Sequence, residues 1–426
     1  MKPKCFSRDR KLTLPISVLL LINFFKSSYS TELKGLFKAI SRSDADISLV
    51  SRSAFCQARK NIRPKSLAWL NKRLVSIAYG SLDLKTWHSH HLVAIDGTTF
   101  RFGHACPKLR AYFGVDNPKR AEPRTMARAS QAYDPLNNIT LDGEMRPYKV
   151  SELTMAKSHL KNLDGVLPDR SLFLLDRNYV TYKFCNQIAD EGHFFCLRAK
   201  CSMTIVKQLE ESAVDDLVVD WRAHKDLYKE LREQGIPLEM RARVLAIDVP
   251  TKDTESSTEK MFLVTNLIDK GLYPYEEFSA LYHLRWGVEE DYKVKKCRLD
   301  IERWSGKSVN SAYQDFYATI FAQNLTSLLT RETEEQVKQM TRKRKWKYKL
   351  NFTAALSEMK DNIVLLLLRK NPTKRLLNLF ASWVTELIPI RPGRHYPRKG
   401  YGRKKNGKSK NQPKLQHNAA PYKPLH

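Results

Sequence analysis

The sequence contains few cysteines, and their spacing does not point to a structural role. No Cys-x-x-Cys pair is present and the number of cysteines is odd, which argues against both a disulfide framework and a zinc site. The seven residues are Cys5, Cys56, Cys106, Cys185, Cys196, Cys201 and Cys297. We therefore expect reduced thiols, either in the core or on the surface.

Long hydrophobic runs are also missing. No span reaches the roughly 20 consecutive apolar residues that a transmembrane helix requires. Residues 11–25 resemble a secretory signal followed by a small-x-small cleavage site at Ser28-Tyr-Ser30, but Pro15 and Asn23 interrupt the apolar run. Together with the unpatterned cysteines and the basic charge described next, this favours a protein that is not exported and acts in the cytoplasm, associated with the nucleoid.

Acidic residues are too few to balance the basic ones. The 426 residues include 74 Lys and Arg against 45 Asp and Glu, a formal net charge of +29. Such an excess is typical of proteins that bind a polyanion, with nucleic acid the leading partner and an anionic membrane the weaker alternative. An apolar content of 42% allows a sizeable core and two or three domains. Residues 391–426 contain eleven Lys or Arg and no acid, which predicts a disordered tail.

The first 85 residues have helical periodicity. We expect an apolar N-terminal helix and further helices at 31–42, 51–60 and 64–79. The last two carry Arg52, Arg59, Lys60 and Arg63. They suit either a small DNA-binding module or a plain helical bundle packed on the main body, and the sequence does not separate these alternatives.

Strand patterns begin at residue 91. A hairpin is expected from strand 92–95 through Asp96-Gly97 to strand 98–102, and further strands at 128–133 and 139–145. Helix 150–163, strand 171–175 ending at Asp176, helix 182–191 and strand 194–198 follow. Strands first and strand–helix alternation afterwards predict an α/β sheet with an antiparallel edge.

The remaining segments predict a β-rich insertion and a helical end. Strands are expected at 203–206, 217–221, 240–249 and 261–264, with a polar turn at 251–260. Beyond residue 310 we expect helical segments at 312–330, at the basic 338–349, and at 363–368.

One short segment between these regions combines unusual side chains. Tyr282, Arg285, Glu289 and Lys296 follow one another at offsets of three, four and seven residues. On a regular α-helix they fall at about 0°, 300°, 340° and 320°, within one narrow face. Such a face could hold a phosphodiester beside a metal ion. An amphipathic surface helix with ordinary charge pairs is the alternative.

Three acids could form a metal site: Asp96 and Asp176 at strand ends, and Glu289 on the motif helix. Rigid strand ends place ligands in an open crevice, and carboxylates favour Mg²⁺ or Mn²⁺. Two such ions would support phosphoryl transfer on a phosphodiester. Each aspartate could equally be a turn residue.

These motifs, in this order, resemble the DDE transposases of the IS4 group of insertion sequences. The similarity rests on Asp96-Gly97-Thr98-Thr99, on Asp176-Arg177-Asn178-Tyr179 and on the Tyr/Arg/Glu/Lys signature, and it spans roughly residues 12–330. It implies an RNase H-like catalytic core in which Asp96, Asp176 and Glu289 hold two Mg²⁺ ions. The family usually has glycine where Asn178 stands. Asparagine tolerates positive φ, so we expect the turn to be preserved.

The resemblance also implies a domain organisation. It comprises a helical DNA-binding region at 1–85, an RNase H-like core at 86–199 and 266–335, a β-rich insertion at 200–265, a helical region at 336–390 and a basic tail at 391–426.

The resemblance further implies how DNA is held. Tyr282, Arg285 and Lys296 would grip the backbone at the transposon end, near the 5′ phosphate of a flipped base. Trp286 would accommodate that base, with core packing as the alternative, and Trp221 is a second stacking candidate.

The function expected from all of this is cut-and-paste transposition. The enzyme would bind terminal inverted repeats of double-stranded DNA and target DNA, and would work as a homodimer on DNA. The tail and residues 338–349 would add sequence-independent affinity. A nuclease that only hydrolyses, or a non-catalytic DNA-binding protein derived from a transposase, are the alternatives.

Overall fold

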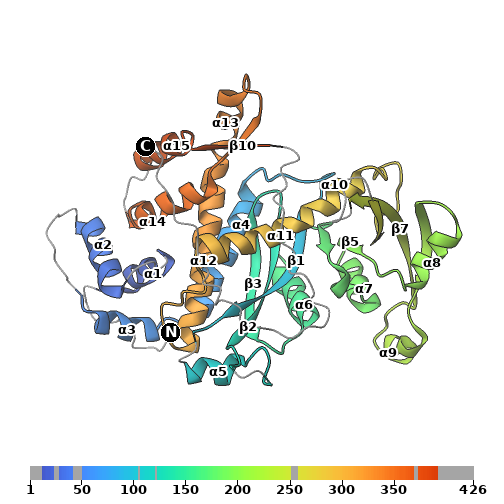
Figure 1. Ribbon diagram of the computed structural model, residues 1–426, viewed down its shortest axis with the longest axis horizontal. Helices are drawn as coiled ribbons and strands as arrows, with labels where there is room; N and C mark the ends of the chain where they lie inside the picture. The colour runs from blue at the N-terminus through green and yellow to red at the C-terminus, as the bar shows by residue number, and fades with distance from the viewer. Residues whose placement is uncertain are drawn as a thin grey trace, which may run out of the picture.

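A mixed eight-stranded sheet forms the centre of the molecule (Figure 1). The computed structural model describes residues 12–23, 28–41, 50–103, 106–119, 122–250, 258–368 and 373–391. The strand order is β3-β2-β1-β4-β5-β8-β7-β6. The strands are β1 Leu92–Arg101, β2 Met126–Asp134, β3 Ile139–Pro147, β4 Leu172–Leu175, β5 Phe194–Arg198, β6 Asp216–Arg222, β7 Glu239–Pro250 and β8 Thr258–Thr265.

Strand directions divide this sheet into a parallel centre and two antiparallel flanks. β1, β4 and β5 run parallel to one another. β2 and β3 continue from β1 in antiparallel order, and β8, β7 and β6 continue from β5 in the same way. The predicted α/β class with an antiparallel edge is confirmed, and β2 and β3 are joined through the predicted turn after Asp134.

The expected hairpin at Asp96-Gly97 is wrong. β1 runs through both residues without turning, and Asp96 pairs with Gln131 while Gly97 pairs with Ser130 of β2. Glycine serves another purpose here. A Cβ atom at Gly97 would lie 2.6 Å from Cδ of Glu152, so the missing side chain lets this glutamate cover the strand.

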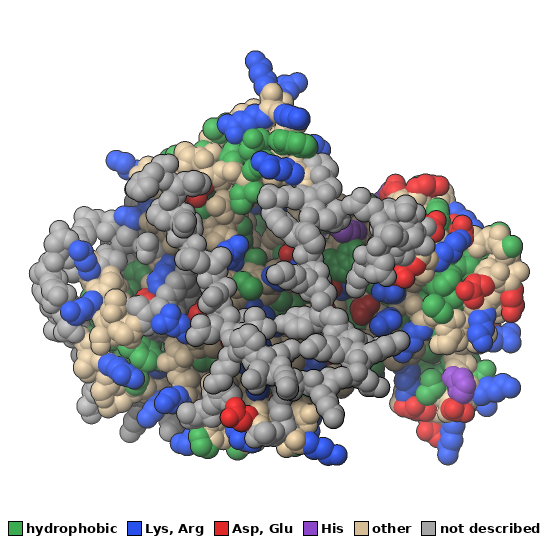
Figure 2. All heavy atoms as spheres, viewed as in Figure 1, with side chains coloured by type: hydrophobic (Ala, Val, Ile, Leu, Met, Phe, Trp, Pro, Cys, Tyr) green, Lys and Arg blue, Asp and Glu red, His purple; other side chains and the backbone are tan. Residues whose placement is uncertain are grey.

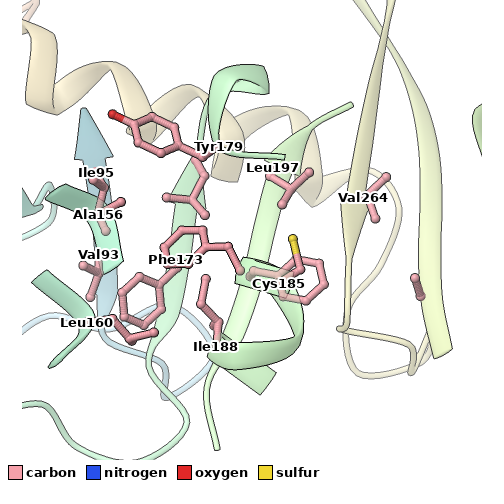
Figure 3. Close-up of a cluster of buried hydrophobic side chains, with 14 of the residues drawn as sticks. Val93, Ile95, Ala156, Leu160, Phe173, Tyr179, Cys185, Ile188, Leu197 and Val264 are labelled. Atoms are coloured by element: carbon pink, nitrogen blue, oxygen red, sulfur yellow. The ribbon is translucent and has the colours of Figure 1, made fainter. Parts of the chain in front are cut away.

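One face of the sheet is covered by α6 (Glu152–Leu163), α7 (Tyr182–Asp190) and α8 (Thr204–Glu211). Figure 3 shows this core, where Ile95, Phe173 and Leu197 of three strands meet side chains of α6 and α7. Because successive side chains of a strand point to opposite faces, the remaining side chains of these strands point to the other face of the sheet. There α5 (Pro107–Phe113), the 282–296 segment and the long helix α12 (Val309–Arg331) pack over β1, β2 and β3.

The segment 200–265 does not stand apart from the sheet. β8, β7 and β6 extend the sheet beyond β5, and α8 packs against β7. Residues 203–206 were expected to form a strand, but they lie at the start of α8. A short apolar run does not by itself separate a strand from a buried helix. The short helices η2 (Lys225–Leu227) and α9 (Tyr228–Glu233) follow β6, and residues 251–257 of the expected turn lie outside the described ones.

The N-terminal helices form a bundle with the C-terminal half of the chain. Their bounds are α1 Leu14–Ile22, α2 Tyr29–Ser41, α3 Arg52–Lys60 and α4 Pro64–Ser81. Their apolar faces share a core with α12 and with α14 (Phe352–Leu368). Arg59 is buried in this bundle, where it bonds to Gln314 and pairs with Asp315 at 2.6 Å, whereas Arg52, Lys60 and Arg63 are exposed.

Beyond α12 the chain is only partly helical. α13 (Glu334–Thr341) is followed by a turn and by β9 (Lys347–Leu350), so the basic 338–349 segment is not the single helix expected. β9 pairs with β10 (Leu387–Ile390), which comes after α15 (Thr373–Trp383). No described helix is long and apolar enough to cross a bilayer. The basic tail after residue 391 lies outside the described residues.

Candidate active site

Asp96, within β1, and Asp176, directly after β4, lie at the same level of two neighbouring parallel strands. Ile95 of β1 is the register partner of Leu175, the last residue of β4, and each aspartate follows directly. Neighbouring strands lie about 4.8 Å apart. Asp176 keeps an extended backbone (φ −82°, ψ 167°) and caps the short 3₁₀ helix η1 (Arg177–Tyr179). The structure therefore brings these two sequence-predicted residues together.

The carboxyl of Asp96 is in an unusual electrostatic environment. Burial raises its pKa to about 6; the Gly97 amide and Arg285 oppose this, and the negative charges of Glu289 and Glu152 add to it. Glu289 is thus close enough to Asp96 to act on its charge, although the two are 193 residues apart in sequence. Tyr292 ties the two elements together, since its hydroxyl donates to the Asp96 carbonyl oxygen at 3.0 Å.

The segment that carries Glu289 is not a regular α-helix. It consists of α10 (Glu277–His283), the 3₁₀ turn η3 (Leu284–Trp286), α11 (Gly287–Lys293) and the π-helical η4 (Val294–Arg298). The angles expected for a continuous α-helix therefore do not apply, because a 3₁₀ turn overwinds the chain and a π turn underwinds it.

Arg285 and Glu289 are in direct contact. Nη2 of Arg285 donates to Oε1 of Glu289 at 2.8 Å. The arginine side chain is only 6% exposed, whereas the glutamate side chain is 43% exposed. In this structure Arg285, predicted to bind a phosphate, and Glu289, predicted to bind a metal ion, therefore form an ion pair with each other.

Tyr282 and Lys296 lie deeper than an exposed phosphate-binding stripe would require. Tyr282 is 1% exposed, and its hydroxyl donates to the Leu175 carbonyl oxygen at 3.2 Å, next to Asp176. Lys296 donates to Thr98 Oγ1 at 2.7 Å, and burial lowers its pKa. Thr98 lies two residues after Asp96 on β1, so both face the motif segment. Tyr282 and Lys296 therefore anchor this segment to the end of β4 and to the middle of β1.

The two tryptophans expected to stack on bases differ in how far their side chains are exposed. Trp286 is 38% exposed and meets His283 edge-on at 4.9 Å between ring centroids. Core packing as its alternative role is therefore wrong. Trp221 is 7% exposed and packs edge-on against Tyr182 in the sheet core, so its proposed stacking role does not fit the structure.

The three consecutive acids on α11 have separate surroundings. Glu289 faces Asp96, and Glu290 is exposed and pairs with Lys293. Asp291 is buried, where it accepts hydrogen bonds from Lys295 and from Gln131 of β2, the latter at 2.6 Å. Of the three, only Glu289 acts on the charge of Asp96, whereas Asp291 fixes α11 on the sheet.

Sequence reasoning missed a polar cluster on the other face of β1. Arg128 Nη1 donates to Glu152 Oε1 at 2.8 Å over Gly97. Tyr179 lies at the same end of the sheet with its hydroxyl directed toward β1 (Figure 3). The Tyr179 hydroxyl, Arg128 Nε and Arg285 Nε are buried and have no hydrogen-bond partner among the described residues. The only sequence signal for Glu152 was its place in the first turn of a helix capped by Ser151.

Asn178 does not need the conformational freedom of glycine. It lies in η1, and it is not among the described residues with positive φ. The substitution of the glycine that is usual in the resembling family therefore leaves the turn after Asp176 unstrained.

The donor set at this site suits a hard divalent cation. Carboxylate oxygens are the ligands that Mg²⁺ and Mn²⁺ prefer, and a cation would relieve the repulsion that Glu289 and Glu152 exert on Asp96. Within the described ranges, no three His, Cys, Asp or Glu side chains already converge as a metal site. Glu289 is instead bonded to Arg285.

Comparison with known families matches the part of the chain that builds this site. The model of the transposase DDE domain matches residues 87–325, more than half of the sequence. The chain belongs to the transposase DDE-domain family. The matched range of this DDE-domain protein includes Asp96, Asp176 and Glu289 and excludes helices α1 to α4.

Two individual proteins are also similar to this DDE-domain protein. The Escherichia coli (strain K12) protein named "Putative transposase InsZ" is 32% identical over 137 residues, which are 32% of this chain and 44% of that relative. The chain therefore matches less than half of the relative's length. A cryo-EM structure of the piggyBac transposase synaptic complex with hairpin DNA aligns with a TM-score of 0.42 and 11% identity, over 89% of this chain and 76% of that one. A likeness at this level carries no conclusion about the site.

Proposed function

We propose that this protein is the transposase of an IS4-type insertion sequence, which binds the terminal inverted repeats of its element and catalyses strand cleavage and strand transfer on DNA. The carrying observation is the placement of Asp96 and Asp176 at one level of parallel strands, with Glu289 acting on the charge of Asp96 from α11. Membership of the DDE-domain family supports the reaction class.

We further propose that the five strands β3-β2-β1-β4-β5 are an RNase H-like core. The support is their order and direction. β3, β2 and β1 are antiparallel neighbours, and β4 and β5 follow on the other side of β1 and run parallel to it. The carboxylate of Asp96 within β1 and that of Asp176 just after β4 are then at the same level of this core.

Asp96, Asp176 and Glu289 are proposed to hold two Mg²⁺ ions, with Mn²⁺ as a substitute. When bound, these ions supply an activated water or sugar hydroxyl and stabilise the leaving oxygen of the phosphodiester. The protein's own contribution is position. The strands fix the two aspartates, and the bond from Tyr292 to the Asp96 carbonyl oxygen holds α11 against β1.

Arg285, Lys296 and Trp286 are proposed to hold the DNA end. Arg285 would exchange Glu289 for a phosphate oxygen, because a guanidinium binds either group through charge-assisted hydrogen bonds. Its Nε is a buried donor without a partner among the described residues. Trp286 offers an exposed ring for a displaced base. Tyr282 contributes by anchoring α10 beside Asp176.

Because two ends must be cut together, we expect a homodimer on DNA. The exposed Arg52, Lys60 and Arg63 of the N-terminal bundle remain candidates for contacts to the repeats, whereas Arg59 is committed to its pair with Asp315.

We keep the proposed division into a bundle at 1–85, a core at 86–199 and 266–335, a sheet extension at 200–265 and a C-terminal region at 336–390. Action in the cytoplasm, at the nucleoid, follows from this function.

The deciding experiment is incubation of the full chain with linear DNA that carries the inverted repeats flanking its gene, with Mg²⁺ and a target plasmid. We expect cleavage at the repeat ends and joining of the freed 3′ ends to the plasmid. Asp96→Asn should abolish both steps and retain DNA binding. Cleavage without joining would favour the nuclease alternative, and DNA binding without cleavage would favour the non-catalytic one. Undiminished cleavage by Asp96→Asn would remove this residue from the reaction.

A further inference from the structure

A basic ribbon projects from the end of the molecule that carries α13. Six cations and two aromatic residues follow one another within residues 342–349: Arg342, Lys343, Arg344, Lys345, Trp346, Lys347, Tyr348 and Lys349. The first four form the turn after α13, and the last three belong to β9. Figure 2 shows Lys and Arg side chains gathered at this tip. In Figure 1, α13 and β10 are well separated from β1 and α11, which carry the active site.

The two strands of this ribbon give it two different faces. In the antiparallel register, Lys347 lies opposite Ile390 and Lys349 opposite Ile388. All four of these side chains are exposed, and the two isoleucines are 45% and 40% exposed. The intervening residues of both strands are half-buried. The outer face is therefore cationic along one strand and apolar along the other.

The charge on the ribbon is not neutralised by acids. None of the six cations forms an ion pair with any residue in the described part of the chain. Instead, Arg344 lies over the Tyr348 ring at 4.8 Å and Lys345 over the Trp346 ring at 5.4 Å. Ring contacts order these side chains while leaving their charge free for an anionic partner.

A ribbon of two strands is an element that duplex DNA can accommodate. The major groove is about 12 Å wide and admits a two-stranded β-ribbon. Unpaired cations at the turn match phosphates, and exposed isoleucines match the methyl groups of thymine in that groove. An anionic membrane would also attract the cations, and vesicle binding tests that alternative below.

We propose that the β9–β10 ribbon and the turn before it bind duplex DNA away from the active site, with the turn on phosphates and the Lys347, Lys349, Ile388 and Ile390 face in the major groove. This deepens and rests on the proposed transposase function, to which it adds a second DNA contact beside the cleaved end. The contact lies outside the matched DDE domain, which ends at residue 325.

The test is the salt dependence of duplex binding by the full chain without divalent ions. The turn variant carries Gln at Arg342, Lys343, Arg344 and Lys345. The control variant carries Gln at Lys225 and Lys229, which are exposed on the opposite side of the molecule around α9. The slope of log K against log salt changes by about 0.9 for each phosphate contact. We expect the turn variant to lose about 3.6 from the slope and the control to lose nothing. An equal slope in wild type and turn variant would overturn the proposal.

A second measurement tests the groove contact. Duplex DNA with 5-bromouracil, whose bromine occupies the place of the thymine methyl in the major groove, is irradiated with the bound protein. We expect crosslinked peptides that contain Ile388 or Ile390, and the yield should fall in Lys347→Gln/Lys349→Gln. Crosslinks confined to other peptides would overturn the groove assignment.

Two further outcomes separate this proposal from its alternatives. Loss of binding to phosphatidylserine vesicles in the turn variant, with duplex binding unchanged, would reassign the ribbon to a membrane. Wild-type protein that binds duplex DNA with the full salt slope but never cleaves would overturn the proposed transposase function and leave the ribbon in place. A turn variant with an unchanged slope and intact cleavage would overturn the ribbon proposal and leave the transposase function in place.

Discussion

Arg285 and Glu289 lie one helical turn apart, and Nη2 of the arginine donates a hydrogen bond to Oε1 of the glutamate at 2.8 Å. The pair joins two side chains with different proposed partners, a phosphate for Arg285 and a metal ion for Glu289. Each side chain orients the other until those partners arrive. DNA and cation would therefore take over this contact together, which couples binding of the end to completion of the acidic site.

Replacement of Arg285 by alanine should impair end processing far more than DNA binding. A hydrogen bond from a charged group contributes about 1.5–3 kcal/mol, so we expect a cleavage rate at least about 10-fold slower. Binding to DNA without repeats should change by less than about threefold, because many other cations contribute. The matched control is Lys293→Ala, which removes an exposed cation of the same segment that pairs with Glu290. Equal losses of cleavage and binding would reduce Arg285 to part of a general basic surface.

The buried pair of Asp291 and Lys295 should be important for stability. Lys295 is fully buried, and Gln131 and Thr140 complete the hydrogen bonds of the pair. Lys295→Met leaves an unpaired buried carboxylate, and we expect the free energy of unfolding to fall by about 3–5 kcal/mol in urea denaturation. The double variant Asp291→Asn/Lys295→Met should lose less than the sum of the single losses. Strict additivity would show that the two charges are not coupled.

The two tryptophans should respond in opposite ways to replacement by alanine. Trp286→Ala should leave the melting temperature unchanged, because its ring is exposed, and should weaken binding of ends with an unpaired terminal base by about 1–3 kcal/mol. Trp221→Ala should destabilise the protein by about 3–5 kcal/mol through a core cavity. Calorimetry and titration with 2-aminopurine at the terminal base measure the two effects. A Trp286→Ala protein that binds such ends normally would exclude stacking.

Restoring glycine at position 178 should not improve catalysis. Asn178 lies in a 3₁₀ helix without positive φ, so the turn after Asp176 gains nothing from glycine. We expect Asn178→Gly to cleave at the wild-type rate within about twofold and to lose about 0.5–1 kcal/mol of stability from added chain entropy. A large rise in activity would show that the asparagine strains the site.

Much of the sheet followed from the sequence because its strands have clear apolar patterns. The runs at 92–95 and 171–175 predicted two buried strands with an acid after each, and the structure sets them side by side in register. Gly97 misled because a glycine after aspartate is typical of turns. Its actual role depends on Glu152, which lies 55 residues later and covers the strand only in the folded chain.

The candidate site was predictable in its residue types but not in their burial. Spacing predicted that Glu289 belongs to the site, yet it could not show the 3₁₀ and π turns that surround α11. Nor could it show the contacts that hold α11 on the sheet, such as the bonds from Tyr292 to Asp96 and from Gln131 to Asp291. Arg128 gave no local signal, because its bond to Glu152 over Gly97 forms only in the folded sheet.

The cooperation of three distant acids is tested most directly by single-turnover cleavage of a repeat-end substrate in a set of matched variants. Asp96→Asn, Asp176→Asn and Glu289→Gln should each slow cleavage at least about 10³-fold, and the double variant Asp96→Asn/Glu289→Gln should be no slower than either single one, because groups that act as a unit are not additive. Glu290→Gln, one residue away but exposed and paired with Lys293, should cleave at the wild-type rate. A Glu289→Gln protein that cleaves as fast as Glu290→Gln would contradict the assignment of Glu289 to the acidic site.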